Sequence, residues 1–139
     1  MQKVRVLVTC QSKIVRSGVA AILESISNME VVGNESAGLM EEAFEQQPDL
    51  LVYELSQIEE DFKVLMKLKE ICGWTKIIAF GTQPIKAEYT YSLLGLCDGY
   101  IQGPIMPGFF IKALELSCYT GYFFFLDPQR QLRANDTKY

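Results

Sequence analysis

The sequence predicts an α/β domain in which a parallel sheet lies between two layers of helices. Short runs of β-branched and apolar residues alternate five times with longer stretches that repeat apolar residues at helical spacing. The connections are short, so each strand is joined to the next through one helix, in a right-handed crossover. At 139 residues, of which 49% are hydrophobic and 22% charged, the chain has the size and composition of one globular domain.

The first part of the chain is predicted to be strand, helix, strand. Residues 3–9 (KVRVLVT) and 29–33 (MEVVG) are short and mostly apolar, as strands buried on both faces are. Between them, residues 11–27 place apolar side chains, beginning with Ile14, on one stripe at helical spacing. Ser12 stands just before this stripe and is a suitable N-cap for the helix.

The middle of the chain places a carboxylate at the end of a buried strand. Residues 37–47 carry apolar side chains, including Phe44, on one face of a second helix, which the following proline ends. Residues 48–56 (PDLLVYELS) then form a loop, a buried strand and Glu54 on the last residue of that strand. Ligands of open α/β sheets bind outside the carboxyl ends of the strands, so Glu54 is the first candidate for a functional residue.

The second half of the chain contains two more strands and three more helices. Residues 76–80 (KIIAF) and 99–102 (GYIQ) are the fourth and fifth predicted strands. Residues 59–72, 85–96 and 107–120 have apolar residues at helical spacing. The whole pattern predicts a doubly wound, three-layer (βα)5 sandwich with the flavodoxin-like strand order 2-1-3-4-5. Its switch point lies between the first and third strands, which places Cys10, Gln11 and Glu54 around one crevice.

Charge and cysteine usage exclude several classes of function. With a net charge of -4 and a pI near 4.9, the chain has no overall basic field, so we expect no direct binding of nucleic acid. The sequence has no histidine, and Cys10, Cys72, Cys97 and Cys118 form no C-x-x-C pair, so no zinc site is expected. Unpaired thiols, the absence of a signal peptide's apolar run and the absence of a membrane-spanning stretch indicate a cytoplasmic protein.

Five short motifs together resemble the receiver domains of bacterial response regulators, above all those of LuxR/NarL-type transcriptional regulators. The similarity extends from about Lys3 to Pro128. The motifs are Val4–Val8, Val15–Gly18, Glu30–Gly33, Pro48–Val52 and Asp98–Ile101. The resemblance implies a receiver-like domain over residues 1–128, followed by a polar tail or interdomain linker over residues 129–139.

In that family, an aspartate at the end of the third strand accepts a phosphoryl group from a histidine kinase. The chemistry needs carboxylates for Mg²⁺, a hydroxyl after the fourth strand and a lysine after the fifth, because cations must offset the transferred charge. This chain departs at every one of these positions. Glu54 replaces the aspartate, Cys10 and Gln11 replace the acidic pair, Gly81 with Thr82 beside it stands at the hydroxyl position, and Gly103 stands at the lysine position. The resemblance therefore implies a degenerate receiver without a metal or other cofactor.

Two of these residues allow a functional and a structural interpretation. Glu54 is either a built-in mimic of the phosphorylated state or a solvated carboxylate in a decayed site. Cys10 is either a redox-sensing thiol or a packing cysteine, and the packing role is favoured because no lysine, arginine or histidine is evident nearby to stabilise a thiolate.

The aromatic residues of the second half are the other candidates. Tyr100 falls where receivers carry a switch aromatic, although it is equally suited to a partly wet edge of the sheet. The last helix and the apolar run after it exceed what one helix face and a short strand must bury, so some of these residues are candidates for an interface. The candidates are Phe109, Phe110, Tyr122, Phe123, Phe124 and Phe125.

The expected function is regulatory and not enzymatic. We expect a phosphorylation-independent signalling domain that acts through protein contact, with homodimerisation as the contact, and that regulates transcription through an attached or partner DNA-binding domain. The alternative is a small-molecule sensor that uses the less charged crevice. An enzyme or flavin protein is disfavoured because the segment from Thr9 to Lys13 has no glycine-rich phosphate cradle.

Overall fold

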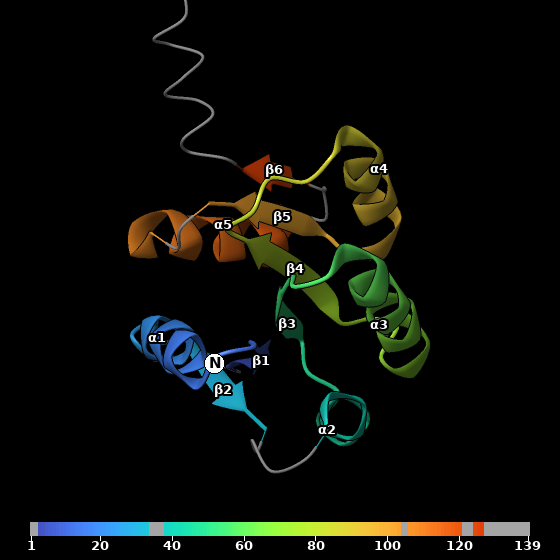
Figure 1. The fold of residues 1–139 in the computed structure, drawn as a ribbon. Helices are drawn as coiled ribbons and strands as arrows, with labels where there is room; N and C mark the ends of the chain where they lie inside the picture. Colours follow the sequence, from blue (N-terminus) through green and yellow to red (C-terminus); the bar gives the residue numbers. More distant parts are fainter. Residues whose placement is uncertain (1–2, 34–37, 104–105, 121–123, 127–139) are drawn as a thin grey trace, which may run out of the picture.

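The computed structural model describes residues 3–33, 38–103, 106–120 and 124–126, which form one parallel sheet with helices on both faces (Figure 1). The strand order is β2-β1-β3-β4-β5-β6, and every neighbouring pair is parallel. The strands are β1 (Val4–Thr9), β2 (Met29–Val32), β3 (Leu50–Glu54), β4 (Lys76–Gly81), β5 (Gly99–Gln102) and β6 (Phe124–Leu126). The predicted fold class and the order 2-1-3-4-5 are confirmed, and β6 is an additional strand beyond the five predicted.

Five helices cover the two faces of the sheet. They are α1 (Lys13–Glu24), α2 (Leu39–Gln46), α3 (Ile58–Ile71), α4 (Ala87–Leu96) and α5 (Pro107–Thr120). In Figure 1, α1 and α5 lie on one side of the sheet, and α2, α3 and α4 lie on the other. The Ser12 side chain accepts a hydrogen bond from the Ile14 amide and caps α1, as predicted. In the described part of the chain, the helices are too short or too polar to cross a membrane.

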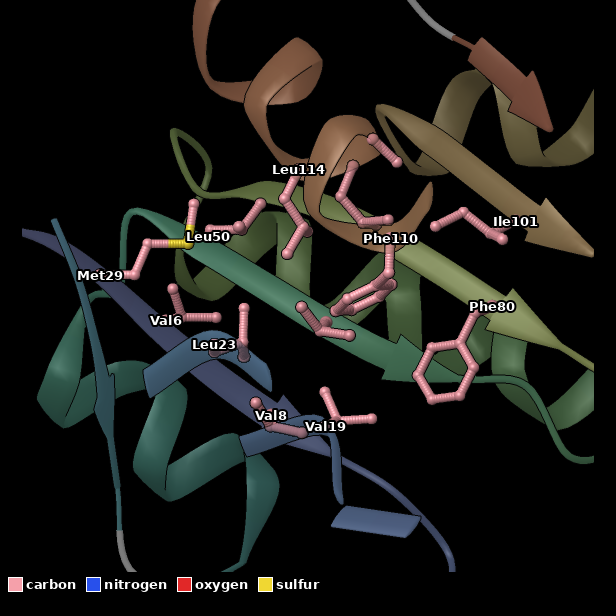
Figure 2. Close-up of a cluster of buried hydrophobic side chains, with 13 residues drawn as sticks. Val6, Val8, Val19, Leu23, Met29, Leu50, Phe80, Ile101, Phe110 and Leu114 are labelled. Carbon is pink, nitrogen blue, oxygen red and sulfur yellow. The ribbon is translucent and has the colours of Figure 1, made fainter. Parts of the chain in front are cut away.

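Alternation along the strands sends side chains into two separate cores. Val6, Leu50 and Val52 point toward α1 and α5, where they meet residues such as Leu23 and Phe110 (Figure 2). The neighbouring residues of the same strands belong to the second core, under α2, α3 and α4. That core includes Leu7, Leu51, Leu65, Leu68, Leu93 and Tyr100. Leu50, Leu51 and Val52 are all fully buried, so β3 is the central strand of both cores.

Two aspartates fix the beginnings of β3 and β5 in the same way. The Asp49 carboxylate accepts from the Arg5 amide, and the Asp49 amide donates to the Arg5 carbonyl. The Asp98 carboxylate and amide make the same two hydrogen bonds with the Ile77 backbone. Asp49 therefore ties the beginning of β3 to β1, and Asp98 ties the beginning of β5 to β4. Both lie at the amino ends of the strands, opposite the end that carries Glu54.

Gly33, which follows β2, requires glycine for its backbone conformation. Its φ is +101°, and a Cβ atom there would lie 2.7 Å from Leu7 Cδ1. Gly18 lies within α1, and a Cβ atom there would meet nothing within 4 Å.

The two glycines should therefore respond in opposite directions to alanine. We expect Gly33→Ala to lower the free energy of unfolding by more than about 1 kcal/mol, because the side chain is strained at positive φ. Gly18→Ala should raise it by about 0.5–1 kcal/mol, because alanine is the better helix former. Urea denaturation measures both changes, and equal effects of the two substitutions would contradict this assignment.

Candidate functional site

The candidate site lies at the carboxyl ends of β1 and β3, which are adjacent in the sheet (Figure 1). Thr9, the last residue of β1, pairs with Tyr53, so Cys10 and Glu54 follow at the same level of the two strands. The chain leaves β1 toward β2 on one side, while β3 lies on the other. This is the predicted switch point, and Cys10, Gln11 and Glu54 are brought together there as expected.

Glu54 is joined directly to the loop that follows β1. Its Oε1 atom accepts a hydrogen bond from the backbone N–H of Gln11 at 2.8 Å, and the residue is partly buried. The next amide, that of Leu55, donates to the Phe80 carbonyl of β4. The carboxylate therefore links the end of β3 to the β1–α1 loop, so Glu54 has a contact within the protein in addition to its contact with solvent.

Cys10 is a neutral thiol in this setting. Its pKa is raised from 9.0 to about 12, first by partial burial and then by the Glu54 carboxylate, while Arg16 of α1 acts in the opposite direction to a smaller extent. Arg16 corrects the expectation that no basic residue acts on Cys10, but its effect is outweighed. Since the thiolate is the reactive form, Cys10 is poorly suited to redox sensing at neutral pH.

The residues at this edge do not fit Mg²⁺. A protonated thiol and an amide are poor substitutes for carboxylate ligands, and Oε1 of Glu54 already accepts from the Gln11 amide. In the described ranges, no three His, Cys, Asp or Glu side chains are grouped so that they could hold a metal ion.

A hydrogen-bonded cluster behind Glu54 was not found from the sequence. Asp61 of α3 is only 2% exposed, and its carboxylate accepts from the Tyr53 hydroxyl and from the Ser56 amide, both at 2.7 Å. Gln11 Nε2 lies 3.4 Å from Ser56 Oγ, which extends the cluster to the β1–α1 loop. Burial and the bond to Asp61 raise the pKa of Tyr53, so its hydroxyl remains a donor.

The glycines that replace the family's hydroxyl and lysine are fixed by the backbone around them. Gly81 ends β4 and is buried, and the exposed Thr82 follows it. Gly103 adopts a φ of +113° and donates its amide to the Gly81 carbonyl at 2.8 Å. A lysine at position 103 would be strained there, so this backbone is built for glycine.

Tyr100 of β5 is fully buried, which corrects the alternative of a partly wet edge. Its hydroxyl oxygen lies 3.4 Å from the place where a Cβ atom on Gly81 would stand. Such a separation is an ordinary van der Waals contact, so the Tyr100 hydroxyl lies directly beside Gly81.

The predicted interface residues fall into different places. Phe110 is 1% exposed and packs against Phe80 with ring centroids 6.5 Å apart, so it belongs to the core and is wrong as an interface residue of the folded chain. Tyr122, Phe123 and the side chain of Phe109 lie outside the described residues. Phe124 and Phe125 belong to β6. The large apolar side chains that are exposed are others, among them Ile14, Phe44, Trp74, Tyr91 and Met106.

The Asp61 cluster should be necessary for stability. We expect Asp61→Ala to lower the free energy of unfolding by about 1–3 kcal/mol, because it leaves the Tyr53 hydroxyl and the Ser56 amide without their acceptor. Glu60→Ala is the matched control in the same helical turn, since Glu60 is exposed and forms an ion pair with exposed Lys63. It should change the free energy by less than about 0.5 kcal/mol in the same urea titration. Equal decreases in the free energy of unfolding of the two variants would show that the Asp61 hydrogen bonds do not stabilise the protein.

Comparison with models of known protein families gave no match, and comparison with curated proteins gave none either. Solved structures do match. A LuxR family two-component response regulator from Aurantimonas sp. SI85-9A1 has a TM-score of 0.71 and 20% sequence identity, over 99% of this chain and 99% of that chain. A LuxR family DNA-binding response regulator from Silicibacter pomeroyi has a TM-score of 0.68 and 23% identity, over 86% of this chain and 94% of that chain.

A third similar structure is described as a CpaE2 pilus assembly protein from Sinorhizobium meliloti 1021. It has a TM-score of 0.62 and 28% identity, over 84% of this chain and 100% of that chain. The likeness to response regulators extends over nearly all of the chain, from the sheet order to the helices on both faces. The chain therefore has the fold of response-regulator receiver domains.

Proposed function

We propose that this chain is a receiver-like signalling domain that works without phosphorylation and acts through protein contact, with a second copy of itself as the partner. The observation that carries the proposal is the hydrogen bond between Glu54 Oε1 and the Gln11 amide. It occupies the position at which a receiver would take up a phosphoryl group with an internal contact between the protein's own loops.

The groups around Glu54 support a site that does not transfer phosphate. Phosphoryl transfer relies on cations that offset the developing charge. The neighbouring positions carry the neutral Cys10 thiol, the Gln11 amide, Gly81 and Gly103. None of these four side chains supplies a charge, so the positions that gather Mg²⁺ and a lysine in a receiver are neutral here.

The same contacts support a switch that rests in one state. Glu54 holds the β1–α1 loop, and the Asp61 cluster holds the β3–α3 loop behind it. Tyr100 is fully buried, with its hydroxyl beside Gly81. With both loops tied and the aromatic residue inside, the domain needs no phosphoryl group to hold this arrangement. In this role Glu54 replaces the phosphoryl aspartate as a structural element.

The proposed output is regulation of transcription through an attached or partner DNA-binding domain, in the cytoplasm. This part draws on the structures described as LuxR family response regulators, one of them DNA-binding. The net charge of -4 supports an output that acts through another domain, since this chain lacks a basic field for phosphate backbones. Residues 129–139 are the proposed link to such a domain. We propose no catalytic role and no bound cofactor.

The small-molecule sensor is supported less well. One oxygen of the Glu54 carboxylate, Oε1, already accepts a hydrogen bond from the Gln11 backbone N–H at 2.8 Å. A ligand that used this oxygen or this N–H group would first have to break that hydrogen bond.

Beryllofluoride with Mg²⁺ tests the proposal. The analogue should leave the amide NMR spectrum of the wild-type protein unchanged, because Cys10 and Gln11 supply no carboxylate for the ion. The triple variant Cys10→Asp, Gln11→Asp, Glu54→Asp restores those carboxylates and serves as the responsive counterpart, with Mg²⁺-dependent shifts expected at residues 10, 11 and 54. Mg²⁺-dependent shifts in the wild-type spectrum, or phosphorylation of Glu54 by acetyl phosphate, would contradict phosphorylation independence.

A further inference from the structure

After α5 the chain returns to the sheet and adds a short sixth strand to the edge of β5. The pairing is parallel, with Gly99 opposite Phe124, Tyr100 opposite Phe125 and Ile101 opposite Leu126. Without β6, the outer edge of β5 would present a row of unpaired N–H and C=O groups, which is a template for pairing with another strand. The strand β6 therefore covers an edge that can bind strands.

The connection from β5 to β6 has the opposite hand to the other crossovers. The β3–α3–β4 crossover moves toward the β5 edge of the sheet and passes over the face covered by α2, α3 and α4 (Figure 1). The β5–α5–β6 connection moves in the same direction but passes over the other face, where Phe110 and Leu114 of α5 pack with Val19 and Leu23 of α1. About 98% of parallel crossovers are right-handed, so this one belongs to the rare class.

The direction of the backbone groups in β5 shows which residues of β6 can form hydrogen bonds with it. The Gly103 amide donates to the Gly81 carbonyl, so Gly103 faces β4. Backbone groups alternate in direction along a strand, so the N–H and C=O groups of Tyr100 and Gln102 face β6. Leu126 stands opposite Ile101, between those two residues, so its own N–H and C=O groups face β5, as do those of Phe124. Those of Phe125 face away from β5.

We infer that the outer edge of β5 is a strand-docking site and that two copies of this chain exchange β6 across it. The segment that fits the edge is already known, because the chain's own β6 occupies it, and a second copy carries the same segment. Exchange keeps every β5–β6 hydrogen bond and removes the need for a crossover of the rare hand within one chain. This inference rests on the self-association in the proposed function and names the surface that carries it.

Proline substitutions at neighbouring positions of β6 test the exchange. Leu126→Pro removes an N–H group that faces β5, so the full chain should become monomeric in sedimentation velocity at concentrations where the wild-type chain dimerises. The Gln102 amide should exchange its hydrogen several-fold faster in this variant, since its partner strand is lost. Phe125→Pro is the matched control, because it removes an N–H group that faces away from β5 and should leave the dimer intact. A dimer that persists in Leu126→Pro would overturn the inference.

A disulfide test shows which copy supplies the strand. Ile101→Cys in one copy and Leu126→Cys in another are opposite each other only if β6 has crossed between copies, and adjacent strands are close enough for a disulfide. After mixing and oxidation, peptide mass spectrometry should find a disulfide between positions 101 and 126. Its yield should be several-fold higher than that of the out-of-register pair Ile101→Cys and Phe124→Cys.

The outcomes separate this inference from the proposed function. A dimer in sedimentation with no disulfide between positions 101 and 126 overturns strand exchange, while self-association through another surface stands. A monomer at every concentration overturns both. The proline variants give a result that does not depend on the Cys variants, since Ile101 is buried and its replacement leaves space in the core.

Discussion

Burial of β3 on both faces is the constraint on which the rest of the structure depends. Leu50, Leu51 and Val52 are fully buried, and alternate residues serve two different cores. A strand of this kind must have helices on both sides and strands on both edges, which determines the sandwich and the central position of β3. Glu54 is the last residue of this strand, so it must lie at the carboxyl end of the sheet, beside the end of β1.

At the carboxyl end of the sheet, hydrogen bonds within the chain stand where a receiver has charged groups and a metal ion. Where a receiver gathers carboxylates, Mg²⁺ and a lysine, this chain has one carboxylate bonded to a backbone amide and a neutral thiol beside it. The buried Asp61 is fully used by Tyr53 and Ser56. These bonds hold the loops that a phosphoryl group would otherwise pull together. The strand exchange proposed at β5 would reach the same region through the backbone, because Tyr100 pairs with Phe125 and its hydroxyl lies beside Gly81.

Much of the fold was predictable because strands and helices are marked by patterns of neighbouring residues. The strand order then followed from the right-handed crossover rule. Apolar runs marked the strands, and Ser12 marked the beginning of α1. Spacing alone placed Ile14 and Phe44 on buried stripes, yet they are 85% and 68% exposed, because periodicity does not show how far a neighbouring element extends over a helix. The strand β6 was not predicted, because the apolar run that contains it was interpreted as a candidate interface.

The site was predicted by position but not by its contacts. Position in the fold brought Cys10, Gln11 and Glu54 together, whereas the hydrogen bond from the Gln11 backbone involves an atom that every residue carries. Asp61 was missed because acidic residues in the first turn of a helix are commonly exposed and favoured by the helix dipole, as neighbouring Glu59 and Glu60 are here.

The most direct measurement of the central claim is hydrogen exchange at the Gln11 amide. If Glu54 holds this loop without phosphate, the amide is protected in the wild-type protein, loses protection in Glu54→Ala, and shows the same rate with or without acetyl phosphate and Mg²⁺. A Gln11 amide that exchanges freely in the wild-type protein and becomes protected only with acetyl phosphate and Mg²⁺ would contradict the account.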